Sequence, residues 1–426
     1  MGTTERLYYH DSRLLEFDAR VVSLSELDDG QIAVTLDRTA FYPAGGGQPT
    51  DVGTLGDARV VDCIDAEEEG VLHVIQGAAP DVGDTVHGKI DWLRRLDHLQ
   101  QHTGQHILSA AFVKLFDAPT LSFRVLEQEC EIDVALGDPT GEGIEQAVDL
   151  ANQIIWESRP ILIREVAAEE AAALPLRKEP SRAGELRLIE IGDFDLTPCG
   201  GTHASSTGEV GVIVVRSWER AKGLTRIHFM AGIRALADYR KANQTAREVA
   251  ASFSAGREDS PVLVARLVEE SKRLRRRIDE LEQVACRFEA EELLRYETGN
   301  GSDRATTSTL NPHTSAISES DCRVIARVFD DRGAESLKHL ALALIAHPRT
   351  IALLGSRDGD TARLVFARST DTPGDMNTLM RAACSLIDGR GGGKPDMAQG
   401  GGKNFENLSE AIEFAAEGLA GGAIRT

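Results

Sequence analysis

Short apolar stretches separated by turn residues occupy the first ninety residues of the chain. The apolar stretches are rich in β-branched residues, which favour strands; they are ARVVSLSEL, QIAVTLDRT, ARVVDCIDA and VLHVIQG. The turn segments between them are DDG, GGGQPTDVG, EEEG and PDVGD. Short strands at this spacing predict a small β-barrel over residues 1–90.

The pattern changes to helical intervals over residues 91–117, where apolar positions recur along one face of a predicted amphipathic helix. Strand-like SFRV and CEIDVAL follow, and then a second helix through IEQAVDLANQIIWES, which ends before Pro160. Further strand patterns lie in ILIREV, LRLIEI and GVIVVRSW. We therefore expect a compact α+β domain over residues 91–235.

Residues 236–297 have a charged helical pattern with apolar residues at coiled-coil steps. This seam consists of Leu267, Leu274, Ile278, Leu281, Ala285 and Phe288. An antiparallel or dimeric coiled coil and a plain helical hairpin would both produce the pattern. Residues 298–318 are rich in Ser, Thr, Gly and Asn and indicate a linker.

The last part of the chain, residues 319–426, alternates strand, helix, strand and strand before a glycine-rich loop, DGRGGGKPDMAQGGG, and a final helix. It predicts a separate α/β domain. The predicted fold is therefore multidomain: a small N-terminal β-barrel, an α+β domain, a helical or coiled-coil segment and a C-terminal α/β domain.

Composition places the chain among water-soluble proteins, with 42% hydrophobic and 27% charged residues. No apolar run is long enough to span a bilayer, and the polar N-terminus lacks a signal-peptide core, so we expect a cytoplasmic protein without a membrane partner. The six cysteines form no CxxC pair, which favours reduced thiols. A net charge of −21 argues against a general nucleic-acid coat protein but leaves room for local basic patches.

Two histidines, His102 and His106, lie four residues apart on the predicted helix of residues 91–117. That spacing places both imidazoles on one helix face, where they could bind one metal ion. Such pairs also arise by chance, so the spacing alone is weak evidence. His98, one turn earlier, could be a rival ligand, although a packing role suits it better.

A second pair, Cys199 and His203, brackets Gly200 and Gly201, which allow a tight turn that brings thiolate and imidazole together. With His102 and His106 it makes a set of one cysteine and three histidines, donors that suit Zn²⁺. The alternative is a buried thiol and an unrelated turn histidine. If all four bind at once, the site could be structural; catalysis needs a loose ligand or a substrate that joins as an extra ligand.

These residues also carry a family resemblance. HTGQH on a helix, followed by PCGGTHASSTGEVG and GLTRIHFMAG, resembles the editing domain of alanyl-tRNA synthetase and the free-standing alanyl-tRNA editing (AlaX) proteins. FYPAGGGQPTDVG is similar to the glycine-rich motif of the longer AlaX forms, and the C-terminal part is similar to that of the synthetase. The resemblance covers essentially the whole chain and points to the long AlaX type.

The resemblance implies a trans-editing hydrolase that uses zinc, held by His102, His106, Cys199 and His203, to deacylate mischarged alanine tRNA. Serine, and also glycine, would be the amino acids removed, as a second sieve that protects translation fidelity without ATP. Only about ninety residues precede the helix of His102, too few for an aminoacylation domain as well, so we expect editing without charging. The alternatives are a non-catalytic tRNA-binding or dimerisation protein with a structural zinc, editing of another tRNA as in threonyl-tRNA synthetase, and an enzyme for a small molecule on this scaffold.

Other residues are expected near the substrate. The family places a discriminating hydroxyl or amide near Thr120 and Ser122, and Thr120 is favoured of the two; the alternative is a strand-start residue bonded to solvent or local backbone. Backbone at Gly45, Gly46, Gly47 and Gln48 could approach a ligand closely, or form only a barrel turn. Candidates for tRNA phosphate contacts are Arg390, Lys394 and Lys403 in the glycine-rich loop, and Arg124, Arg164, Arg177, Lys178, Lys222 and Arg226 near the α+β domain. We also expect a homodimer through the seam and the C-terminal domain.

Overall fold

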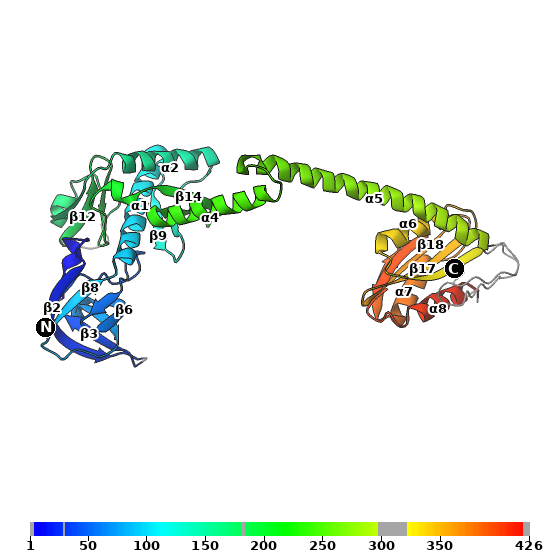
Figure 1. Cartoon of the computed structure of the whole chain (residues 1–426), viewed down its shortest axis with the longest axis horizontal. Helices are drawn as coiled ribbons and strands as arrows, with labels where there is room; N and C mark the ends of the chain where they lie inside the picture. Colours follow the sequence, from blue (N-terminus) through cyan, green and yellow to red (C-terminus); the bar gives the residue numbers. More distant parts are fainter. Residues whose placement is uncertain (1–3, 29, 180–183, 297–321, 421–426) are drawn as a thin grey trace. The chain divides into compact units, whose positions relative to one another are not determined.

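The computed structural model describes residues 4–28, 30–179, 184–296 and 322–420 (Figure 1). The chain divides into two compact units, Met1–Arg257 and Glu258–Thr426. The predicted linker 298–318 lies outside the described residues. Within the described ranges no helix combines the length and the apolar character needed to cross a bilayer.

A closed six-stranded barrel forms the N-terminal part of the first unit. In barrel order its strands are β2 (Glu16–Glu26), β3 (Ile32–Leu36), β7 (Val71–Gln76), β6 (Ala58–Asp65), β5 (Gly53–Leu55) and β8 (Thr85–Ile90). Alternate residues of β2 point into the core, so Phe17, Ala19 and Val21 are buried while their neighbours face solvent. The barrel agrees with the sequence prediction, although β5 and β8 were not predicted. Two short strands, β1 (Glu5–Arg6) and β4 (Arg38–Thr39), pair beside it.

Helix α1 (Trp92–Phe116) follows the barrel directly. The Asp91 carboxylate accepts from the Arg94 backbone N–H and caps its N-terminus, and Asp117 ends it in the left-handed conformation at φ 50°. The helix is buried without interruption from His98 to Phe112. A helix covered on all sides can bring its polar side chains into an enclosed site.

Two antiparallel sheets and a second helix surround α1. One sheet has the order β14 (Ile213–Ala221), β15 (Leu224–Ala231), β10 (Cys130–Val134) and β9 (Thr120–Val125). The other has the order β11 (Ile161–Val166), β12 (Leu186–Ile191) and β13 (Asp195–Pro198). The remaining helices of this part are α2 (Gly141–Trp156), the short α3 (Ala168–Ala171) and the 3₁₀ turns η1 (Leu7–Tyr9), η2 (Glu67–Glu69) and η3 (Thr207–Val210).

A buried arginine fastens α1 to the barrel. The Arg95 side chain has no solvent exposure and forms an ion pair with Asp51, which is equally buried in the barrel loop between β4 and β5. Its two terminal nitrogens also donate to the carbonyls of Ser12 and Ala40, each at 2.6 Å. His98 is buried beside the pair, its Nδ1 3.8 Å from an Asp51 oxygen. His98 therefore has the packing role expected of it, in a site apart from the other histidines of α1.

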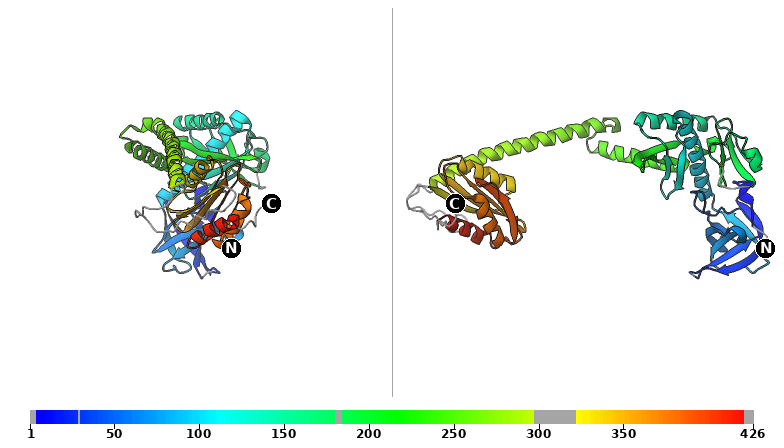
Figure 2. Two further views of the ribbon diagram at one scale, coloured as in Figure 1. Left: turned by 90° about the vertical axis from the view of Figure 1, so that its right-hand side faces the viewer. Right: turned by 180° about the vertical axis from the view of Figure 1, so that it is seen from behind.

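The helical segment predicted over residues 236–297 consists of two helices. Helix α4 (Gly232–Ala251) belongs to the first unit. The 3₁₀ turn η4 (Arg257–Asp259) comes next, and α5 (Ser260–Tyr296) belongs to the second unit. Figure 2 shows α5 reaching well beyond the rest of its unit. The seam residues Leu274, Ile278 and Leu281 lie on this long helix with exposures of 52%, 56% and 52%.

The second unit is a five-stranded sheet with helices on both faces. Its strand order is β16 (Arg323–Asp330), β17 (Thr350–Asp358), β18 (Thr361–Arg368), β20 (Met397–Gly402) and β19 (Gly389–Gly393); only the pairing of β16 with β17 is parallel. Helix α6 (Ala334–Ile345) and the end of α5 pack on one face. Helices α7 (Met376–Leu386) and α8 (Leu408–Ala420) pack on the other.

The glycine-rich segment corrects the sequence prediction, because it is a β-hairpin of β19 and β20 rather than a loop. Its glycines allow α7, which was not predicted, to lie directly on the strands. A Cβ at Gly391 would come within 2.7 Å of the Cys384 sulfur of α7, and one at Gly400 within 2.4 Å. Glycine is therefore required here by close packing rather than by a flexible loop.

Candidate metal centre

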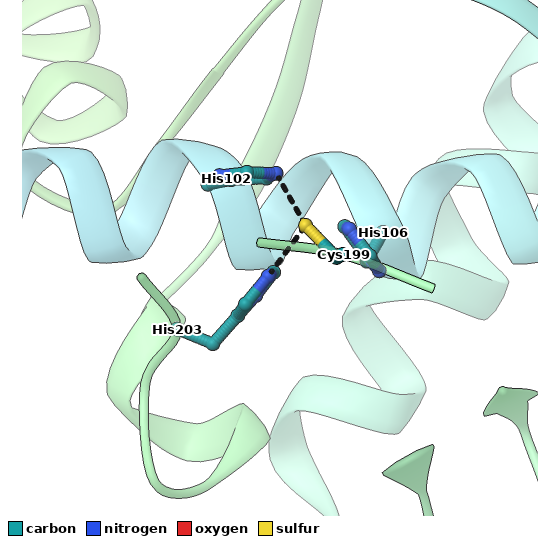
Figure 3. A group of neighbouring side chains, drawn as sticks. All are labelled: His102, His106, Cys199 and His203. Atoms are coloured by element: carbon teal, nitrogen blue, oxygen red, sulfur yellow. Dashed lines mark hydrogen bonds between the residues drawn. The ribbon is translucent and has the colours of Figure 1, made fainter. Parts of the chain in front are cut away.

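Four side chains from two distant segments converge beside α1 (Figure 3). His102 and His106 come from consecutive turns of α1, and Cys199 and His203 from the loop that follows β13. One donor atom of each lies within 4.8 Å of the others. The Cys199 sulfur is 3.4 Å from His102 Nε2 and 3.3 Å from His203 Nε2. The structure thus brings together all four metal ligands expected from the sequence.

Each histidine of the group uses its Nδ1 atom for a hydrogen bond to a neighbouring side chain. The pairs are His102 Nδ1 with Gln48 Oε1 at 2.8 Å, His106 Nδ1 with Asp195 Oδ2 at 3.2 Å, and His203 Nδ1 with Thr103 Oγ1 at 3.3 Å. When Nδ1–H donates outward, the lone pair is left on Nε2, the ring nitrogen that can face a shared metal ion.

The spacing of the donors fits zinc. Bond lengths of about 2.3 Å for Zn–S and about 2.0–2.1 Å for Zn–N imply tetrahedral S···N edges of roughly 3.6 Å. The two measured edges from Cys199, 3.4 Å to His102 and 3.3 Å to His203, are close to this value. One thiolate and three imidazoles are also donors that zinc prefers. The residues present therefore fit a zinc ion.

The pKa shifts of Cys199 and His203 suit metal binding, whereas the pKa shift of His106 favours its protonated form. Burial alone would raise the pKa of the Cys199 thiol, but the His102 and His203 imidazoles beside it hold that pKa well below the usual thiol value. Burial lowers the pKa of His203 to about 3, which leaves its ring neutral. Burial opposes the charged form of His106, yet its bond to Asp195 raises the pKa of His106. A thiolate and neutral imidazoles are the forms that bind a metal.

The loop that carries Cys199 is held from both sides. A Cβ at Gly201 would lie 2.2 Å from His102 Cε1, so only glycine fits between the loop and that ring. Arg187 Nη1 donates to the carbonyls of Cys199 at 2.7 Å and Gly201 at 3.0 Å, and Arg187 Nε donates to the Tyr9 carbonyl at 3.0 Å. These contacts fix the tight turn that the sequence suggested.

Asp195 orients the His106 ring through a hydrogen bond between its carboxylate and Nδ1. Its carboxylate accepts from Arg177 Nε at 2.6 Å and from Thr197 Oγ1 at 2.9 Å as well as facing His106 Nδ1. Burial would raise the pKa of Asp195, but the bonds to His106 and Arg177 lower it well below the usual carboxyl value. The carboxylate therefore stays ionised and orients the ring.

A pocket of about 730 Å³ opens onto the centre and is lined by His102, His106 and Cys199. Gly45 and Gly46 of the glycine-rich motif also line it. Gly47 packs instead against the Phe123 backbone, where a Cβ would meet the carbonyl oxygen at 2.3 Å. The backbone of this motif forms a turn in which Gly45 and Gln48 exchange hydrogen bonds of 3.0 and 2.9 Å.

Gln48 is buried and reaches the metal centre rather than the open pocket. Its Oε1 contacts His102, and its Nε2 donates to Thr202 Oγ1 at 2.8 Å. The residue was predicted as part of a substrate-binding turn; the structure places its side chain where it orients a candidate ligand.

Thr120 and Ser122 both line the pocket at the start of β9. The Thr120 hydroxyl donates to Ser109 Oγ at 2.6 Å, at the floor of the pocket. The Ser122 hydroxyl donates to an Asp133 oxygen at 2.7 Å, on the exposed side of the strand. Of the two, Thr120 is bonded within the buried polar group beside the centre.

Most of the basic residues proposed near the α+β domain already have acidic partners. The pairs are Arg124 with Glu131, Arg164 with Glu190, Arg177 with Asp195 and Arg226 with Asp133. Lys178 lines the pocket, and Lys222 lies in the turn between β14 and β15. In the second unit, Arg390 and Lys403 line a separate open pocket of about 530 Å³, and Lys394 follows β19 in the hairpin turn.

Three residues near the centre were not singled out from the sequence as supporting groups: Gln105, Arg187 and Asp195. Gln105 has a local signal, since it lies inside the HTGQH segment. Asp195 and Arg187 contact the centre only because β12 and β13 pair beside α1, which no spacing along the chain reveals.

Three segments match known protein families. Residues 186–228 match the threonyl and alanyl tRNA synthetase second additional domain, residues 322–421 match the DHHA1 domain, and residues 3–94 match the tRNA synthetases class II (A). The first of these segments contains Cys199 and His203.

Whole-chain relatives are also found. The alanyl-tRNA editing protein AlaX-L of Pyrococcus horikoshii is 33% identical over 408 residues, covering 93% of this chain and 94% of the relative. The alanine–tRNA ligases of Methanothrix thermoacetophila and Pyrobaculum neutrophilum are each 31% identical, over 96% and 97% of this chain. The chain spans 44% of the length of each ligase. The solved C-Ala domain of Aquifex aeolicus alanyl-tRNA synthetase aligns with 24% of this chain and 93% of its own, at 29% identity and a TM-score of 0.23.

Proposed function

The chain belongs to the family of alanyl-tRNA editing proteins of the AlaX-L type, and on that premise we propose that it is a zinc-dependent hydrolase of mischarged alanine tRNA. The bond cleaved is the ester between an amino acid, serine or glycine, and the 3′-terminal ribose of the tRNA. The observation that carries the proposal is the convergence of His102, His106, Cys199 and His203 on one point at the end of a pocket.

The chain's own residues can prepare this site without rearrangement. Gln48, Thr103 and Asp195 fix the three imidazole rings, and Arg187 holds the loop of Cys199 by two carbonyls. A bound zinc ion would supply either a Lewis-acidic contact for the substrate amine or an activated water. The pocket is large enough for an aminoacylated terminal nucleoside, and its open side leaves room for the rest of the tRNA.

The tRNA partner would be held partly by the second unit, where Arg390, Lys394 and Lys403 lie on one glycine-rich hairpin. Among the described residues none of these three side chains has an acidic partner, in contrast to Arg124 and Arg226 of the first unit. We also propose a homodimer, because the exposed seam of α5 is apolar at coiled-coil steps.

Deacylation of purified tRNA charged with serine, glycine or alanine, before and after chelation of the metal, tests the proposal. We expect about one zinc per chain and hydrolysis of the serine ester that chelation abolishes and added zinc restores. His106→Ala and Cys199→Ala should each abolish hydrolysis, whereas Cys322→Ala, a cysteine outside the group, should retain it. Full turnover by a correctly folded, metal-free preparation contradicts the mechanism. Hydrolysis of threonine tRNA in preference to alanine tRNA would instead indicate the threonyl-type activity.

A further inference from the structure

Gln105 lies on α1 directly before His106 and lines the same pocket. Gln105 is only 6% exposed, so its side chain is more than nine-tenths buried and faces the cavity rather than bulk solvent. A carboxamide is an expensive group to bury without hydrogen bonds for both its nitrogen and its oxygen. Its bonding therefore indicates whether it serves the fold alone or a ligand as well.

Only the nitrogen of this carboxamide is bonded within the protein. Gln105 Nε2 donates to Ser109 Oγ at 2.8 Å, and Thr120 Oγ1 donates to the same oxygen at 2.6 Å. Among the described residues no donor reaches Gln105 Oε1. Some polar atoms of the protein, such as His98 Nδ1, are fully buried and have no hydrogen-bond partner in the part of the chain that the structure describes. Gln105 Oε1 is not one of these fully buried atoms, so it is accessible at the pocket surface.

We propose that Gln105 is a specificity-determining residue whose Oε1 accepts a hydrogen bond from the hydroxyl of the substrate's amino acid. The inference rests on the proposed function and names the group that recognises serine in that site. Serine brings an O–H that satisfies the open acceptor, whereas the methyl group of alanine would cover it and leave it unpaired. Glycine has no side chain, so it neither donates a hydrogen bond to this oxygen nor covers it.

Three serine and threonine hydroxyls on α1 and β9 are less suited to this role. Ser109 is fully buried and already accepts two hydrogen bonds. Ser122 is engaged with Asp133 at 2.7 Å. The Thr120 hydroxyl donates its hydrogen bond to Ser109 Oγ, the atom that also binds the carboxamide, and so helps hold the carboxamide in place. Gln105 thereby acts as the acceptor, and Ser109 and Thr120 act as positioning residues.

The test compares kcat/KM for the same alanine tRNA carrying serine, glycine or alanine. Gln105→Leu removes the acceptor at similar volume and should lower the serine-to-glycine ratio by about tenfold to a hundredfold. Gln105→Glu keeps an acceptor, with Ser109 turning its proton toward it, and should retain most of the ratio. Gln244→Leu is the matched control, because Gln244 makes the same i to i+4 contact on the exposed face of α4.

Zinc content is measured for every variant, since Gln105 adjoins His106. If the leucine variant loses metal, Ser109→Ala serves instead: it frees the carboxamide to rotate and should lower the same ratio by a smaller factor. Equal losses for serine and glycine, or a glutamate variant that discriminates no better than leucine, overturn the inference while leaving the proposed function intact. A wild-type protein that hydrolyses none of the three esters overturns the proposed function, and this inference with it.

Discussion

At the scale of single residues, two adjacent glycines that look alike in the sequence have different requirements. A Cβ on Gly201 would overlap the His102 ring, at 2.2 Å from Cε1 and 2.5 Å from Nδ1. A Cβ on Gly200 would meet only the Tyr9 ring and hydroxyl, at 3.6 Å or more, which is ordinary contact. Close approach to a candidate metal ligand therefore explains Gly201 but not Gly200.

Gly201→Ala should consequently push His102 off its position, because the new Cβ would overlap its ring while Arg187 holds the loop by two carbonyls. We expect zinc affinity to fall by at least tenfold, measured by competition with a chromophoric chelator, together with the deacylation rate. Gly200→Ala is the control and should change either quantity by less than about threefold. Equal effects of the two substitutions would argue against this geometry.

The same scale shows which parts of the centre are predictable from sequence. His102 with His106, and Cys199 with His203, are pairs of local spacing, and the structure brings the two pairs together as expected; that they hold zinc stays a prediction. The groups that orient them are not local. Asp195 lies 89 residues from His106, and Gln48 lies 54 residues from His102, so only the tertiary fold reveals these contacts.

At the scale of elements, the joint between the barrel and α1 depends on one buried ion pair. Burial would raise the pKa of Asp51, but the charge of Arg95 beside it lowers the pKa below the usual carboxyl value. A carboxyl with a lowered pKa in the folded state stabilises the fold above the unfolded pKa of about 3.9 and loses that contribution as the pH falls through the folded value.

Asp51→Asn should therefore destabilise the first unit by about 3–5 kcal/mol at neutral pH, because it leaves the Arg95 charge buried without a partner. The measurement is urea unfolding of wild type and variant between neutral pH and about pH 3. The gap in unfolding free energy between the two should narrow toward the acid end. A gap that is constant over the whole range would contradict the assignment of the stabilisation to this carboxylate.

Element prediction from the sequence found the helices around His102 and through residues 141–156 but failed for the glycine-rich segment and for α7. Residues 389–402 were assigned to a loop because glycine usually disfavours strands, yet they form β19 and β20. The deciding factor is the approach of α7, whose Cys384 leaves no room for a Cβ at Gly391 or Gly400.

The seam of α5 leads to a prediction about assembly. Leu267 and Phe288 near its two ends are 52% and 66% exposed, so an apolar stripe runs along the helix. If two copies pair through it, Leu274→Ser combined with Leu281→Ser should convert a dimer into a monomer in light scattering at micromolar concentration. Arg276→Ser on the same helix serves as the control. An unchanged mass for the double variant would contradict dimerisation through this seam.

At the scale of the whole molecule, charge must be arranged unevenly for a tRNA to bind at all. The net charge is −21, so a polyanion is repelled at long range unless basic groups are gathered on one surface. In the first unit, arginines such as Arg124 and Arg226 form ion pairs with carboxylates. The hairpin of β19 and β20 presents Arg390, Lys394 and Lys403 without such partners in the described part of the chain.

The triple variant Arg390→Ala, Lys394→Ala, Lys403→Ala should weaken tRNA binding and flatten its dependence on salt. Each phosphate contact that is lost should reduce the slope of log K against log salt by about 1 or slightly less. The loss should appear in KM rather than in kcat, because these residues and the metal centre belong to different compact units. Superimposable salt plots for variant and wild type would mean that the three charges only keep the hairpin soluble.

The contact between Gln48 and His102 ties a barrel loop to the helix that carries two of the four metal donors. Thermodynamic linkage makes such a tie reciprocal: whatever free energy it adds to metal retention, metal binding returns as stability of the barrel against α1. A substitution that loosens the barrel loop of Gln48 should therefore change metal affinity at a distance, through the orientation of His102.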